Sequence, residues 1–124
     1  MYDNGYMVKK EEREMNLVTR DSLQALLMGP KAAEVVGRAL KAIFIANQTE
    51  DERTANSTNK WNGVGFSGAD ARSASITAKY YIKHGKLLPW QVDQWTKRQK
   101  NGYARLVKYA KQLNEIAIAK KGEQ

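Results

Sequence analysis

The chain has 124 residues, no cysteine and a formal net charge of +8. This length predicts one domain that can bury a core without cross-links, and the lack of cysteine excludes disulfides and thiolate metal sites. No apolar run is long enough to span a bilayer, and the first residues lack the apolar core of a signal peptide. We therefore expect a protein of the cytoplasm that does not associate with membranes.

The positive charge is concentrated in the second half of the chain. Residues 1–59 carry eight Lys or Arg against nine Asp or Glu, whereas residues 60–124 carry thirteen against four. A one-sided basic half is typical of proteins that bind a polyanion. The alternative is a lysine-rich surface that is simply solvated.

The first half predicts an arm followed by helices. Residues 1–18 mix charges without a clean period and predict a flexible or partly helical arm, with a single helical domain over residues 19–124. Asp21 and Gln24 match a capping box at the start of a first helix. Residues 30–47, which open on a proline suited to the first helical position, are apolar nearly all round and predict the buried central helix.

A short acidic helix is expected next. Thr49 and Glu52 match a second capping box, and the helix should run to about Thr54. The polar residues 55–60 that follow predict a loop.

The most glycine-dense part of the chain is residues 61–71, Trp-Asn-Gly-Val-Gly-Phe-Ser-Gly-Ala-Asp-Ala. Glycine permits backbone angles that other residues resist. Ser67 resembles a helix N-cap with Asp70 three residues on, a variant of the capping box. The stretch therefore predicts a folded turn, anchored by its apolar side chains, that leads into a helix over residues 68–84.

The same stretch also contains the pattern G-x-G-x-x-G at residues 63–68. A polar segment precedes it and no acid lies about twenty positions on, which argues against a dinucleotide site. Free N–H groups at the start of a helix can still bind an anion. The alternative is a tight turn that holds Trp61 and Phe66 in the core. The candidate phosphate-binding turn consists of Gly65, Ser67 and Gly68.

Three further features place the remaining helices. Gly85 is expected as the C′ residue of the helix before it, and Leu88-Pro89 should begin a short helix that Asn101-Gly102 breaks. Residues 103–120 have apolar positions alternately three and four apart, which is the clearest amphipathic helix of the chain. No segment has the pattern of a strand. We predict an all-α fold, a single-domain bundle of five or six helices with a glycine-rich central turn.

Catalytic chemistry is poorly supported. The one histidine, His84, lies among lysines at an expected helix end, and one histidine without cysteine gives no zinc site. The acids at residues 50–52 are consecutive and diverge around a helix. We expect a non-enzymatic protein with no catalytic residue, no metal and no cofactor.

Basic residues interleaved with aromatic ones are the strongest functional pattern. Trp95 and Tyr103 lie on apolar stripes and are assigned to the core, whereas Trp90 lies off its stripe and could stack on a base. The candidate nucleic-acid-binding residues are Lys79, Lys83, Lys86, Trp90, Lys97, Arg98, Lys100, Arg105, Lys108 and Lys111.

Residues 49–113 resemble a segment of phage and mobile-element proteins, which occurs alone or appended to phage helicase-like proteins. The resemblance covers about half of the chain. The shared features are an acidic-polar stretch with Arg53, Asn62-Gly63-Val64-Gly65-Phe66, Asp70-Ala71, a leucine before a short helix with Gln94, Leu106-Val107-Lys108-Tyr109 and Gln112-Leu113. The resemblance implies a DNA-related setting in a phage or in the cytoplasm of its bacterial host, and it carries over no catalytic residue.

These observations support two functional hypotheses. The first is a small phage-type nucleic-acid-binding protein, with DNA as the favoured partner, that contacts phosphates through its basic C-terminal half. The second is an interaction protein that uses the basic face to bind and inhibit an acidic host protein or nucleoprotein complex. Binding to any DNA that weakens with salt favours the first hypothesis.

Overall fold

The computed structural model describes residues 17–58 and 64–122. These residues form six α-helices and one 3₁₀-helix, and they contain an isolated antiparallel bridge between Arg98 and Ala104 but no β-strand. The predicted all-α bundle of five or six helices is confirmed. Residues 1–16 of the predicted arm and Trp61 lie outside the described residues.

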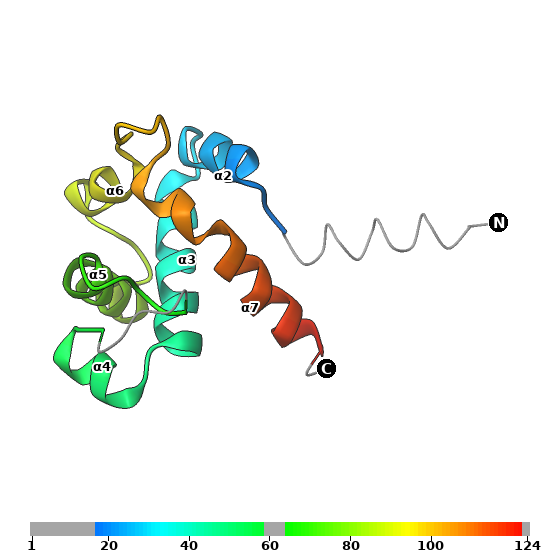
Figure 1. Ribbon diagram of the computed structural model, residues 1–124. Coiled ribbons are helices and arrows are strands. Elements are labelled where there is room, and N and C mark those ends of the chain that lie inside the picture. Colours follow the sequence, from blue (N-terminus) through cyan, green and yellow to red (C-terminus); the bar gives the residue numbers. More distant parts are fainter. Residues whose placement is uncertain (1–16, 59–63, 123–124) are drawn as a thin grey trace.

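The helices pack around one central element (Figure 1). Helix α3 runs through the middle of the molecule, with α5 and α6 along one side, α2 across its beginning and α7 on the other side. None of the described helices combines the length and the apolarity needed to cross a membrane. The helices are α2 (Arg20–Leu27), α3 (Ala32–Asn47), α4 (Glu50–Ala55), α5 (Ala71–His84), α6 (Pro89–Thr96), η1 (Arg105–Tyr109) and α7 (Ala110–Gly122).

Helix α3 supplies the centre of the core. Val36, Leu40 and Ile43 are fully buried, as expected for the apolar stripe of a central helix. The helix begins at Ala32, two residues later than predicted. The prediction that it is buried nearly all round is wrong on one side, because the Ile45 side chain is 51% exposed.

Helix α3 also approaches α5 closely, through a glycine. A Cβ atom at Gly37 would collide with the ring of Tyr81, so only glycine fits this crossing without a shift.

The N-terminus of α2 is capped by residues other than those predicted. Thr19 and Ser22 form the capping box, with the Ser22 N–H donating to Thr19 Oγ1 and the Thr19 N–H donating to Ser22 Oγ. Asp21 and Gln24 instead serve long-range contacts: Asp21 accepts from the Tyr103 hydroxyl at 2.9 Å, and Gln24 Oε1 accepts from the Ala104 N–H at 2.8 Å. Both pairs, Thr19 with Ser22 and Asp21 with Gln24, have the three-residue spacing of a capping box. Asp21 and Gln24 do not cap the helix because they bond Tyr103 and Ala104 instead.

The remaining caps follow the sequence more closely. The capping box of Thr49 and Glu52 on α4 is confirmed. Gly85 ends α5 in the left-handed conformation with φ 70°, and Pro89 opens α6, both as predicted. Ser67 does not cap α5, which begins at Ala71 rather than at residue 68.

The last predicted helix is divided into two parts. Residues 105–109 form the 3₁₀-helix η1, and α7 begins only at Ala110. The tighter winding of η1 turns Leu106, Val107 and Tyr109 into the core together. Val18, assigned to the arm in the sequence analysis, packs against the core, and both its N–H and its carbonyl group bond the Asn114 side chain.

Candidate nucleic-acid interface

The glycine-rich turn is held by two glutamine side chains. Gln112 of α7 accepts from the Gly65 N–H at 2.6 Å through Oε1, and its Nε2 donates back to the Gly65 carbonyl at 3.1 Å. Gln48, which follows α3, accepts from the Phe66 N–H at 2.8 Å. Gly65 has φ 82°, a conformation suited to glycine. These bonds place Phe66 in the core, where it is fully buried, whereas Val64 remains half exposed.

Two of the three residues of the turn predicted to bind phosphate have their backbone N–H bonded within the fold, and the third, Gly68, is exposed. The Gly65 N–H bonds Gln112, and the Ser67 N–H donates to the Tyr109 hydroxyl at 3.1 Å. The Asp70 carboxylate already occupies the two cations nearest to the turn, Arg105 and Lys108. The geometry therefore favours the tight structural turn over a phosphate site.

Asp70 is the electrostatic centre of this region. Its Oδ1 lies 2.6 Å from a guanidinium nitrogen of Arg105, and its Oδ2 lies 2.6 Å from Lys108 Nζ and accepts from the Tyr109 hydroxyl at 2.6 Å. Burial by itself would raise the pKa of Asp70. The hydrogen bonds from Lys108, Tyr109 and Arg105 outweigh burial and lower that pKa below its ordinary value. Asp70 is thus an ionised, fully partnered carboxylate in the fold.

The partners of Asp70 are fixed in turn. The Arg105 guanidinium lies 4.8 Å from the centroid of the Trp95 ring, within cation–π range. Burial and the bond to Asp70 raise the pKa of the Tyr109 hydroxyl well above its ordinary value, so it remains a proton donor. A hydroxyl and an amine do meet here, since Lys108 Nζ lies 3.2 Å from Ser67 Oγ. Lys108 Nζ is also paired with Asp70, at 2.6 Å from Oδ2.

Two of the predicted phosphate ligands therefore have a structural role. Arg105 is only 24% exposed and Lys108 is 40% exposed, and both neutralise Asp70. The other predicted cations from the second half of the chain are exposed. The structure places them in two separate groups.

The first group lies at the end of the molecule where α2 meets η1. Arg20, Lys108 and Lys111 line a cavity of about 270 Å³ together with Val18, Thr19 and Asn114. The turn between α6 and η1 is joined to α2 by the bonds from Tyr103 to Asp21 and from Ala104 to Gln24, and it lies beside α2 in Figure 1. We call this group the basic end. It consists of Arg20, Lys97, Arg98, Lys100, Lys108 and Lys111.

Arg20 was missed in the sequence analysis. It lies in the charge-balanced first half, more than eighty positions from Lys108 and Lys111, the other two cations of the cavity. A local sequence pattern cannot predict contacts between residues so far apart in the chain. The only sequence feature that singled out Arg20 was its position at the start of a helix.

The second group lies along α5 and at the start of α6. Lys79, Lys83 and Lys86 are exposed, and Lys79 Nζ donates to the Asn56 side chain at 2.6 Å. Trp90 is 60% exposed, as expected, whereas Trp95 is fully buried. This group is on the opposite side of α3 from α7 (Figure 1).

Among the residues that the structure describes, no group of three metal-ligating side chains is present. Comparison of the whole chain with family models, with curated proteins and with solved structures found no match. The fold and the surface charges are therefore the basis of the functional conclusion.

Proposed function

We propose that the protein binds nucleic acid, with DNA as the favoured partner, and contacts the phosphate backbone through the basic end. The observation that carries this proposal is the meeting of Arg20 and Lys111 around one small cavity, which Lys108, the partner of Asp70, also lines. Cations gathered from distant parts of a chain suit a phosphate group, whose charge they neutralise with release of counterions.

The neighbouring turn extends this surface. Lys97, Arg98 and Lys100 are exposed and belong to a segment that is bonded to α2. One exposed acid, Asp21, lies nearby and accepts from the Tyr103 hydroxyl, whereas Asp70 is buried and neutralised. The cations of the basic end outnumber these acids, and no base-reading helix is needed for this mode of binding.

The test is the salt dependence of binding to a labelled DNA duplex, measured by fluorescence anisotropy. Lys108 is paired with Asp70, so five cations of the basic end remain for phosphate. They should give a slope of about −4.5 for log affinity against log salt, or about a 500-fold loss between 50 and 200 mM salt. Simultaneous Lys97→Glu, Arg98→Glu and Lys100→Glu substitutions should weaken binding to every sequence and reduce the slope to about −2. The melting temperature should stay nearly unchanged, because exposed charges contribute little to stability.

A matched variant separates the two groups of cations. Lys79→Glu, Lys83→Glu and Lys86→Glu change the net charge by the same amount on α5 and just after it, so a general charge effect would weaken both variants equally. We call the substitutions at Lys97, Arg98 and Lys100 the turn variant, and those at Lys79, Lys83 and Lys86 the α5 variant. The proposal requires the turn variant to lose much more DNA affinity than the α5 variant. Equal losses, or binding by the turn variant that matches the parent, would refute the assignment to the basic end.

A further inference from the structure

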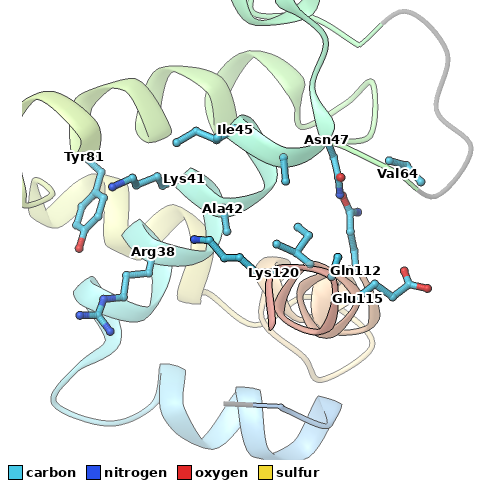
Figure 2. Close-up of a pocket in the computed structure, with 13 residues that line it drawn as sticks. Arg38, Lys41, Ala42, Ile45, Asn47, Val64, Tyr81, Gln112, Glu115 and Lys120 are labelled. Atoms are coloured by element: carbon cyan, nitrogen blue, oxygen red, sulfur yellow. The ribbon is translucent and has the colours of Figure 1, made fainter. Parts of the chain in front are cut away.

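A groove lies between α3 and α7, away from the basic end. Its volume is about 950 Å³, and Figure 2 shows the side chains that line it. Helix α3 contributes one wall and α7 the other, and the two helices diverge toward the C-terminus of α7 in Figure 1.

Most of the groove interior is apolar. Ile45 is 51% exposed and Val64 is 50% exposed, and Ala42, Ile116 and Ala119 complete this apolar surface. Near Val64 the groove is closed by Asn47 and Gln112, whose side chains bond each other at 2.6 Å. The apolar surface includes the side of α3 that the sequence predicted to be buried, and no described element covers it. Contiguous exposed apolar surface of this kind marks interaction sites.

The rim of the groove is mostly positive. Arg38, Lys41 and Lys120 direct their charged ends toward the Tyr81 end of the groove, whereas Glu115 points away on the opposite side (Figure 2). Glu115 is the one acid among the lining residues. Arg38 also pairs with Glu34 at 3.0 Å, but both side chains are well exposed and the pair is weak.

We propose that this groove is the docking site for an acidic amphipathic α-helix of a partner protein. The apolar interior fits the apolar stripe of such a helix, with anchors at positions i, i+3, i+4 and i+7, and the cations of the rim fit glutamate or aspartate beside that stripe. The volume corresponds to roughly two turns of a helix about 10 Å across. A nucleic acid would use the cations but would leave the apolar interior without a partner.

This site is separate from the basic end. None of the three rim cations belongs to the basic end, and neither proposal depends on the other.

The direct probe is a fluorescein-labelled peptide of about 18 residues, with leucines at helical spacing on one face and glutamates on the rest, long enough to form an isolated helix. The first control peptide has lysines in place of the glutamates. The second has the same composition as the probe, with the leucines dispersed around the helix. We expect the probe to bind at least about tenfold more tightly than either control, since the groove needs both the apolar stripe and the acids. Amide chemical-shift changes should lie in α3 and α7.

Substitutions in the protein test the same two features. Lys41→Glu with Lys120→Glu should weaken the acidic peptide about tenfold and reverse the preference in favour of the lysine peptide. The charge-matched control is Lys31→Glu with Arg72→Glu, two exposed residues outside the groove. Ile45→Glu should also weaken binding about tenfold, whereas Ile82→Glu, at a similarly exposed isoleucine of α5, should not.

Three results would contradict the proposal, and two of them would assign the groove to another kind of partner. Equal affinity for the three peptides, or an Ile45→Glu variant that binds like the parent, would overturn the proposal. Self-association of the chain that Ile45→Glu abolishes would assign the groove to a second copy. Loss of DNA affinity in the Ile45→Glu variant, with no peptide bound, would assign it to nucleic acid.

Discussion

Replacing Asp70 by asparagine tests the electrostatic centre of the fold. Asparagine has nearly the same shape, so the substitution removes the charge and leaves the packing in place. The Asp70 side chain is 2% exposed, and its loss as an anion leaves Arg105 and Lys108 without a counter-ion. Removal of one member of a buried ion pair typically costs 3–5 kcal/mol, but water can reach these two partners, so we expect Asp70→Asn to lower the free energy of unfolding by about 2–3 kcal/mol at pH 7.

The pH dependence of this loss has a defined sign. The pKa of Asp70 in the folded state lies below its ordinary value of 3.8. A lowered pKa stabilises the fold fully at pH values above the unfolded pKa, and the stabilisation disappears as the pH falls through the folded pKa. The difference between parent and Asp70→Asn should therefore be constant above about pH 5 and narrow below the ordinary pKa.

Urea denaturation followed by tryptophan fluorescence, at several pH values between 3 and 7, measures this difference. The control is Asp93→Asn, at an exposed acid of α6, which should change the free energy of unfolding by less than about 0.5 kcal/mol. An Asp70→Asn loss as small as that of the control would refute the reasoning. So would a loss that stays the same in acid, because the effect would then come from packing and not from charge.

The remaining predictions concern packing and the glycine turn. Leu40→Ala should lower the free energy of unfolding by about 2–5 kcal/mol in chemical denaturation, because Leu40 is fully buried at the centre of α3; a loss below about 0.5 kcal/mol would show that the core lies elsewhere. Gly65→Val should destabilise or prevent folding, because its φ of 82° disfavours a β-branched residue and a Cβ there would collide with Gln48. A Gly65→Val variant with an unchanged melting temperature would contradict the described geometry of the turn.

Features set by neighbouring residues were predictable from the sequence. The capping box of Thr49 and Glu52, the left-handed Gly85 and the proline at the start of α6 each depend on a few adjacent positions. The apolar residues of 30–47 likewise predicted the central helix, and Val36, Leu40 and Ile43 of α3 are fully buried.

Features that depend on distant partners were not predictable. Asp70 has the spacing of a capping residue, but its partners lie 35 to 39 positions away and turn its side chain toward η1. Arg105, predicted to contact phosphate, is instead paired with Asp70, and the Ser67 N–H donates to the Tyr109 hydroxyl. Hydrophobic patterning also cannot say how much of an apolar helix its neighbours will cover, which is why the exposed side of Ile45 was not foreseen.

Helix α7 connects the two proposed surfaces and explains how they can act separately. Lys111 lies on the side that faces α2, whereas Glu115, Ile116 and Ala119 line the groove with α3. Gln112, which lines the groove, also bonds both the N–H and the carbonyl group of Gly65 in the glycine turn. If both proposals hold, Ile45→Glu should leave the salt slope of DNA binding unchanged, and the turn variant should bind the acidic peptide like the parent. The two sets of substitutions should then be additive, as expected for sites with no shared contacts.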